Sequence, residues 1–385
     1  MIKTEAWLLY PKISSDKQQT AELIQETISF SEPTGEEVLV EPLYGCWEGN
    51  MTHAVNRSPI DICRERGEDK VVIGNAGVVR VLRSNALAPT LKEGDHCWIF
   101  SSAEQDRLGY MTNALAYDAC NTMGLLAKTS KIPARCLVKI PTSSRYSLKQ
   151  WATFSIRYVS AWANWKVAYN TWRIQTTIKD CASPFVVAWG GGVALAELLL
   201  AKHFGAKVLM MTSNKHRISY CESLGISTID RSALANFEYM KDSFEQDPKY
   251  KSSYLKSENL FLEQIKELGK GQDVSIFIDN IGGPVYRATL KALGRQGVLT
   301  TTGWKAGMHL STLRASECIS QHQHIHTHYG RLADGIEAMK FADENDWILP
   351  VIEQPYPWDN IPNLLHDINS GTSNNYFPLF QVNPE

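Results

Sequence analysis

The feature that most constrains this fold is a buried strand that runs through three glycines into an apolar helix. Residues 185–188 (FVVA) are a short apolar run typical of a buried strand, and residues 193–203 (VALAELLLAKH) favour a helix. Glycines let a backbone approach a phosphate closely, and a helix start offers free N–H groups and a partial positive charge. The segment therefore predicts a pyrophosphate cradle made of Gly190, Gly191, Gly192 and Val193.

The spacing of the turn leaves its exact alignment open. Counted back from the helix, Trp189 takes the first glycine position of G-x-G-x-x-G, Gly191 the second and Ala194 the third, where alanine is accepted. Gly190 could supply the tight turn in place of Trp189. The position of the motif between a strand and a helix favours a dinucleotide site.

The second strand, residues 207–211 (KVLMM), indicates which dinucleotide binds. NAD sites usually place an acid at the end of this strand to bind the ribose 2′-OH. Residues 212–217 contain hydroxyl and basic groups and no acid. A basic surface turn would look the same, but a 2′-phosphate would be bound well here. We expect NADPH, held by Ser213, Asn214, Lys215 and Arg217.

Strands and helices alternate between residues 151 and 320, which indicates βαβ units and a doubly wound parallel sheet. Further strands are predicted at 275–278 and 297–301, with a helix around 286–293 between them. Residues 1–150 are β-rich instead. The fold class is therefore α/β. The charged stretch 231–266 is predicted to be a solvated excursion from the sheet.

Charge and cysteine content exclude some classes of protein. The 39 Lys+Arg and 41 Asp+Glu residues argue against a nucleic-acid partner. No run reaches the ~18 apolar residues that a membrane helix needs, and the first twenty residues lack the pattern of a signal peptide. The 8 cysteines are scattered along the chain. We expect a cytoplasmic protein with reduced thiols and no membrane partner.

The chain resembles the medium-chain dehydrogenase/reductase superfamily over nearly its whole length. The matching stretches are 191–194 (GGVA), 92–95 (KEGD), 160–162 (SAW, usually Thr-Ala-Tyr) and 278–283 (IDNIGG). Within the superfamily the chain is most similar to the crotonyl-CoA carboxylase/reductase group. That group has a long insertion, which residues 228–231 (TIDR), 241–242 (KD) and 246–249 (QDPK) match.

The resemblance implies two domains and an activity. Residues 1–155 and 326–385 would form a split β-rich, GroES-like catalytic domain around a Rossmann domain at 156–325. Trp162 would border the cofactor, and the sheet edge near residues 308–318 would pair two copies into a homodimer. The group reduces enoyl thioesters with NADPH. We therefore expect an NADPH-dependent oxidoreductase that reduces the activated C=C bond of an acyl thioester on CoA or a carrier protein.

The carboxylating members of the group trap carbon dioxide in a pocket that uses an Asn, a Phe-Glu pair and the His of an S-H-F stretch. Tyr117-Asp118 falls where the Phe-Glu pair would be, and residues 327–329 (THY) resemble S-H-F. Asn50 is the nearest candidate for the Asn. Asp118 and His328 are thus candidate catalytic residues, and reductive carboxylation is an alternative activity.

The resemblance also implies where a catalytic zinc would bind. Cys46 falls at the first ligand position, but Gly74-Asn75-Ala76 stands where zinc-dependent members have G-H-E, and no cysteine lies between 137 and 180. We expect no metal. An alternative metal face is His322, His324, His326 and His328, which would share one side of a strand but span too far for one ion.

An enoyl reductase needs a proton donor for the α-carbon. His53 and Tyr44 lie in the expected active-site mouth, although either could be a structural polar group. Two further functions remain open. One is a carbonyl or alcohol oxidoreductase of the same fold, and the other is a catalytically degenerate scaffold protein.

Overall fold

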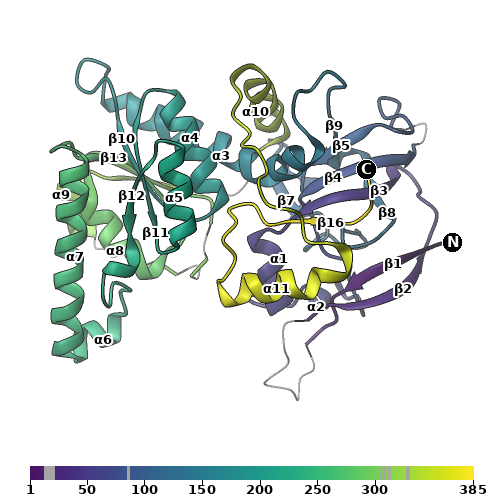
Figure 1. Ribbon diagram of the computed structural model, residues 1–385, viewed down its shortest axis with the longest axis horizontal. Helices are drawn as coiled ribbons and strands as arrows, with labels where there is room; N and C mark the ends of the chain where they lie inside the picture. The colour runs from purple at the N-terminus through teal and green to yellow at the C-terminus, as the bar shows by residue number, and fades with distance from the viewer. Residues whose placement is uncertain are drawn as a thin grey trace. The chain divides into compact units, whose positions relative to one another are not determined.

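The computed structural model describes residues 1–12, 22–84, 87–303, 305–306, 309–310, 312, 314–326 and 330–385. The chain divides into two compact units: Met1–Val159 with Arg331–Glu385, and Ser160–Gly330. The sequence placed these boundaries at 155/156 and 325/326. Helix α3 (Leu148–Gln175) begins in the first unit and ends in the second (Figure 1).

The first unit is built around an antiparallel sheet. Its strand order is β16-β3-β4-β5-β9, with β8 also paired to β3, while β1 pairs with β2 and β6 with β7. The predicted β-rich domain is confirmed. The elements are β1 (Ile2–Leu8), β2 (Ile24–Phe30), β3 (Glu37–Cys46), α1 (Gly49–Asn56), α2 (Ile62–Arg66), β4 (Gly77–Arg83), β5 (His96–Ile99), β6 (Ser102–Gln105), β7 (Met111–Ala114), β8 (Ser130–Pro133), β9 (Leu137–Lys139), α10 (Leu332–Asn345), α11 (Ile361–Ser370) and β16 (Leu379–Gln381).

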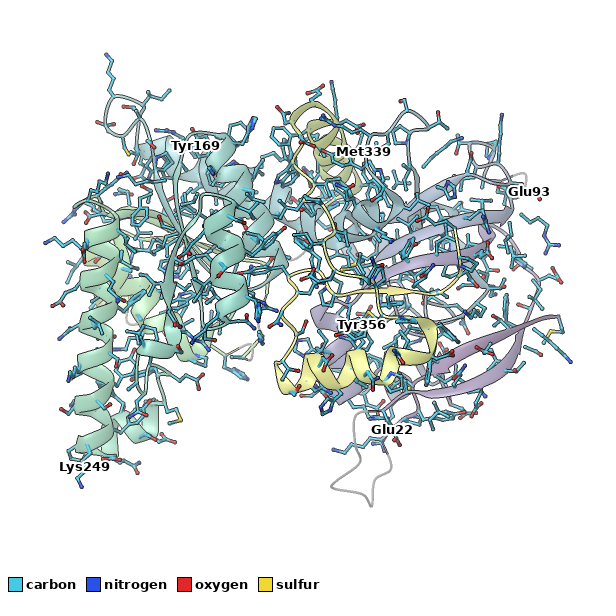
Figure 2. The ribbon with its side chains drawn as sticks, viewed as in Figure 1. Glu22, Glu93, Tyr169, Lys249, Met339 and Tyr356 are labelled. Carbon is cyan, nitrogen blue, oxygen red and sulfur yellow. The ribbon has the colours of Figure 1, made fainter. Side chains whose placement is uncertain are left out.

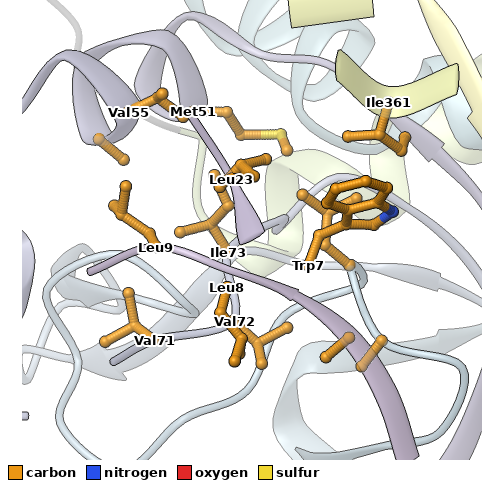
Figure 3. Close-up of a cluster of buried hydrophobic side chains, with 14 of the residues drawn as sticks. Trp7, Leu8, Leu9, Leu23, Met51, Val55, Val71, Val72, Ile73 and Ile361 are labelled. Carbon is orange, nitrogen blue, oxygen red and sulfur yellow. The ribbon is translucent and has the colours of Figure 1, made fainter. Parts of the chain in front are cut away.

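Two hydrophobic clusters are found among the described residues of this unit. Val38 and Val40 of β3 and Val79 and Val81 of β4 are buried in one of them, because successive side chains point to opposite faces of a sheet. The other cluster joins Trp7 to residues of α1 and α11. Figure 3 shows it, with Met51, Val55 and Ile361 around Trp7 and its strand neighbours.

The second unit is a parallel sheet with strand order β12-β11-β10-β13-β14-β15, which confirms the doubly wound prediction. Helices α4 and α5 lie on one side of it, and α7 and α8 on the other (Figure 1). The elements are β10 (Phe185–Trp189), α4 (Gly192–His203), β11 (Lys207–Thr212), α5 (Lys215–Ser223), β12 (Ser227–Asp230), α6 (Lys241–Gln246), α7 (Pro248–Leu268), β13 (Val274–Asp279), α8 (Gly283–Ala292), β14 (Leu293–Thr301), α9 (Arg314–Ser320) and β15 (Gln323–His326).

The stretch 231–266 is not the solvated excursion that its composition predicted. Helix α7 buries Tyr254, Phe261 and Ile265, and Phe261 and Ile265 join the core cluster beneath the sheet. Spacings of seven and four residues place these side chains on one face of a helix. Apart from Glu258, the charged residues of α7 are exposed, as Lys249 is at the start of the helix (Figure 2). Because charged residues are numerous in α7, the sequence analysis did not identify the buried apolar face of this helix.

A buried carboxyl group, Glu258, anchors the stretch 231–266, which we call the insertion, to α8. Its side chain is fully buried, and its oxygens accept from Arg287 Nε at 3.0 Å and from Lys291 Nζ. The Tyr254 hydroxyl donates to the same carboxylate at 3.1 Å. The insertion is therefore a packed part of the second unit. None of the helices in the described part of the chain has the length and apolarity needed to cross a bilayer.

A second buried carboxyl group predicts a pH dependence of stability. Asn164 Nδ2 of α3 donates to both Glu197 oxygens of α4, at 3.1 and 2.8 Å, and Asn164 Oδ1 accepts from the Thr300 hydroxyl at 2.6 Å. Burial raises the pKa of Glu197 from 4.5 to about 8. The folded state therefore binds a proton that the unfolded state loses, so this contribution to stability is present below pH ~4.5 and disappears as pH rises toward ~8.

We expect Glu197→Gln to flatten this dependence. The free energy of unfolding of the wild-type chain, measured with denaturant, should fall by roughly 3 kcal/mol between pH 5 and 8 through this group. The neutral variant should lack that part of the fall. Equal pH slopes in the two proteins would contradict the assignment.

Candidate dinucleotide site

The turn between β10 and α4 has open space at its centre. Gly190 has φ +138°, and a Cβ there would lie 3.3 Å from the Cβ atoms of both Ala194 and Asn280. This position therefore requires glycine. Gly191 precedes the helix, and a Cβ added to it would have no described atom within 4 Å. Gly191 is also exposed, so a ligand can approach its backbone.

Trp189 lies outside the turn. It is the last residue of β10, its indole is fully buried, and it stacks on Phe261 and Phe277 at centroid distances of 5.3 and 5.8 Å. Its Nε1 donates to the Thr289 hydroxyl at 2.8 Å. The indole therefore belongs to the core on the α7 and α8 side. Gly190 supplies the tight turn, which is the alternative that the sequence left open.

Asn214, which follows β11, caps a helix, and three cations from different segments of this unit lie close enough to repel one another. Asn214 caps α5, because its Oδ1 accepts from the backbone N–H groups of His216 and Arg217 at 3.0 and 3.2 Å. The pKa of Lys305 is lowered, first by burial and then by the positive charges of Arg217 and Arg231. Arg217, Arg231 and Lys305 therefore form a region of positive potential, which we call the cation cluster. A bound phosphate would relieve its repulsion.

A pocket of about 360 Å³ opens beside Ser213 and Arg231. The insertion supplies much of its wall, through Phe237, Met240 and Tyr250. The lining thus combines a hydroxyl and a guanidinium with apolar and aromatic side chains. That combination suits a planar base attached to a phosphate.

These features fit an NADP-type dinucleotide. No described atom lies within 4 Å of a Cβ added to Gly191, and the first turn of α4 offers backbone N–H groups beside it. Asn280 Nδ2 is buried and has no hydrogen-bond acceptor among the described residues. The cation cluster lies in the same unit. Each of these donors and charges suits a phosphate oxygen.

In the first unit, a guanidinium lies where the resemblance would place a metal. Arg157 Nε pairs with Glu48 Oε1 at 2.9 Å, and its Nη2 donates to the Trp47 carbonyl at 2.6 Å. Arg157 also donates to the Tyr376 carbonyl. Cys46 is completely buried beside them, and burial raises the pKa of its thiol far above the usual range. A protonated thiol and a fixed cation are unsuited to a zinc ion.

The position of the histidine ligand carries an amide, Asn75, and Ala76 follows it. Asn50 Nδ2 donates to Asn75 Oδ1 at 3.1 Å, and Asn75 is buried. Among the described residues, no group of three or more His, Cys, Asp or Glu side chains could hold a metal ion. His324 Nδ1 instead lies 3.2 Å from the Tyr286 hydroxyl.

Removing the Arg157 guanidinium should strongly destabilise the chain. We expect Arg157→Met to lower the free energy of unfolding by about 3–5 kcal/mol, because it leaves the Glu48 carboxylate buried without a counter-charge. Adding Glu48→Gln should recover a large part of the loss, because the amide removes the stranded charge. Denaturant unfolding of the two single variants and the double variant measures this. Strictly additive effects would contradict a coupled pair.

The candidate proton donors lie in the first unit. Tyr44 is buried, and burial together with the neighbouring Glu385 carboxylate raises its pKa to about 12. His53 in α1 is half-buried, and burial lowers its pKa. The Asp118 carboxylate accepts from the Ala114 N–H at 2.5 Å, which closes a turn. His328 lies outside the described residues. The catalytic roles of Tyr44, His53, Asp118 and His328 stay predictions.

Trp162 is half-buried in the part of α3 that belongs to the second unit. Sequence analysis assigned no role to Arg157, Asn280, Arg231 or Lys305. One signal was available: Arg157 is a lone charge in the apolar run 151–165, a position where a buried charge needs a partner. The clustering of the other three residues depends on which strand ends meet in the sheet.

Comparison with known proteins gives a partial match. Residues 192–344 match the family model described as zinc-binding dehydrogenase. A quinone oxidoreductase-like protein 2 homolog from Nematostella vectensis is 26% identical over 189 residues, which are 49% of this chain and 42% of that protein. Crotonyl-CoA reductase from Streptomyces collinus is 24% identical over 187 residues, 48% of this chain and 40% of that protein. The match thus spans less than half of each relative.

Among solved structures, the crotonyl-CoA carboxylase/reductase AntE in complex with NADP is similar over 100% of this chain and 96% of its own. The TM-score is 0.79 and the sequence identity 16%. Likeness at this identity shows the fold and does not show the reaction.

Proposed function

We propose that the protein is an NADPH-dependent oxidoreductase, because residues 192–344 match the zinc-binding dehydrogenase family model and the fold is similar to that of a crotonyl-CoA carboxylase/reductase in complex with NADP. Its substrate is an activated C=C bond, in an acyl thioester carried by CoA or a carrier protein. The proposal rests above all on one observation: the open turn at Gly191 and the cation cluster lie in the same unit.

Different residues of the chain would bind the dinucleotide and protonate the substrate. The backbone of Gly191 and Gly192 binds the pyrophosphate, and Ser213, Lys215 and the cation cluster bind the 2′-phosphate. When bound, NADPH would supply the hydride for the β-carbon. Tyr44 and His53 are the candidates for donating the proton to the α-carbon.

We propose that this reaction needs no zinc. The ion pair of Arg157 with Glu48 supports this, because the guanidinium already supplies the positive charge beside Cys46 and Glu48. The buried Asn75 adds support, since its amide stands in the place of the histidine ligand. Metal analysis of the purified chain should find less than stoichiometric zinc, and chelator treatment should leave turnover unchanged.

The thioester substrate is supported by the relatives. Crotonyl-CoA reductase and the crotonyl-CoA carboxylase/reductase are named for their action on such thioesters, and the latter structure is a complex with NADP. The carrier and acyl chain are left open by this proposal. Reductive carboxylation would need Asp118 and His328 to face the substrate, which the turn-closing bond of Asp118 does not favour.

Turnover with a substrate panel tests the proposal. NADPH oxidation is followed with crotonyl-CoA, longer enoyl-CoA thioesters and their carrier-protein equivalents, with and without bicarbonate. Simple ketones, aldehydes and quinones complete the panel. We expect turnover on at least one enoyl thioester. Turnover confined to carbonyl substrates would assign a carbonyl reductase, and NADPH binding without any turnover would favour a scaffold.

We also propose a homodimer in the cytoplasm. Strand β15 is at the edge of the described sheet, where pairing with a second copy is possible. The expected pairing segment, residues 308–318, lies largely outside the described residues. All eight cysteines are free, as a reducing compartment would keep them. Light scattering during size-exclusion chromatography should give about twice the chain mass.

A further inference from the structure

Asn280 borders the glycine turn from the neighbouring strand. Strands β10 and β13 are paired in parallel, with Trp189 opposite Asp279, so the residues that follow them meet at the same edge of the sheet. A Cβ placed on Gly190 would lie 3.3 Å from Asn280 Cβ and 3.8 Å from Asn280 Nδ2. The amide nitrogen of Asn280 therefore lies beside the first glycine of the turn.

The orientation of this amide is fixed by its oxygen. Asn280 Oδ1 accepts from the backbone N–H groups of Thr302 and Gly303 at 2.9 and 3.2 Å, and from the Thr302 hydroxyl at 3.3 Å. Rotating the amide would place its NH₂ group against two N–H donors. Nδ2 must therefore face the other way. It is buried there without an acceptor among the described residues, an arrangement that is costly unless a ligand supplies one.

We infer that Asn280 Nδ2 donates a hydrogen bond to a pyrophosphate oxygen of the bound dinucleotide. The inference rests on the proposed function and adds a binding residue to that site. The pyrophosphate is the part of the ligand expected above Gly190 and Gly191. Because NADPH and NADH share this group, Asn280 contributes to the affinity for both and does not discriminate between them.

Asn280 also positions the segment that carries one member of the cation cluster. Its backbone carbonyl accepts from Lys305 N at 3.4 Å, and the next carbonyl, of Ile281, accepts from Ala306 N at 2.9 Å. Together with the bonds to Thr302 and Gly303, these hold residues 302–303 and 305–306 against the end of β13. One residue thus connects the pyrophosphate turn to the loop of Lys305.

Substituting Asn280→Asp separates ligand binding from this structural role. An aspartate keeps an oxygen for the N–H groups of Thr302 and Gly303 but replaces the donor with a negative oxygen beside the phosphate. We expect NADPH and NADH to bind the full-length variant more weakly by the same factor, on the order of 10–100-fold, in calorimetric titrations. Adenosine 2′-monophosphate, which has no pyrophosphate, should bind within about twofold of wild type.

Thermal unfolding without ligand provides the folding control, and Asn280→Asp should unfold near the wild-type temperature. If that variant does not fold, Asn280→Ala replaces it, with an expected loss of about tenfold. Asn259→Ala, on the exposed face of α7, is the matched control and should bind as wild type does. A folded Asn280 variant that binds NADPH within twofold of wild type overturns the inference alone. Failure of the wild-type chain to bind either dinucleotide overturns the proposed function as well.

Discussion

Gly191→Asp should weaken NADPH binding by at least ~100-fold while leaving the fold intact. An added Cβ at this position has no described atom within 4 Å, so the side chain can be accommodated without displacing a neighbour. Its carboxylate would then occupy the space that the pyrophosphate needs. Two like charges about 4 Å apart near a protein surface repel by ~4 kcal/mol, enough for a loss of this size. Calorimetric titration measures the affinity.

The control for this variant is Gly191→Ala, which adds a methyl group without charge. It should lose much less affinity than the aspartate, because the helix N-terminus still attracts the phosphates. Circular dichroism and the unfolding temperature should be close to wild type for both. NADPH binding by a folded Gly191→Asp protein at wild-type affinity would show that the phosphates bind elsewhere.

Loss of the two arginines of the cation cluster should remove the preference for NADPH over NADH. We expect Arg217→Ala and Arg231→Ala each to weaken NADPH binding by roughly 10–100-fold, the range for hydrogen bonds to charged groups, and to change NADH binding much less. The reason is that only NADPH carries the 2′-phosphate. Titration with both cofactors gives the ratio of dissociation constants.

Lys249→Ala is the matched control, because it removes one positive charge from the exposed start of α7. Its NADPH affinity should equal that of wild type at physiological ionic strength. If Arg217→Ala and Arg231→Ala lower the affinities for NADPH and NADH equally, the cluster binds a group common to both, and the 2′-phosphate assignment is wrong.

The second unit could be predicted from the sequence because local signals coincide there. A buried apolar strand, glycines and an apolar helix follow one another within residues 185–203, and each is read from its own residues. The predicted strands at 207–211, 275–278 and 297–301 are present as parts of β11, β13 and β14. Parallel strands buried on both faces have continuous apolar runs, which makes them visible in a single sequence.

The insertion and the site residues depend on contacts that a single sequence does not show. Helix α7 is rich in charged residues, and its buried stripe makes sense only beside Trp189 and Phe277. Glu258 looks like a surface residue until Arg287 and Lys291 are placed against it. Arg231, Asn280 and Lys305 follow three different strands, and only the order of strands in the sheet brings them to one edge.

The wild-type chain titrated with NADPH and NADH in a calorimeter tests the central claim most directly. One NADPH should bind per chain, at least tenfold more tightly than NADH, because charge-assisted hydrogen bonds to the 2′-phosphate distinguish the two. A flat titration with both cofactors would contradict the dinucleotide site at Gly191 and the oxidoreductase function that depends on it.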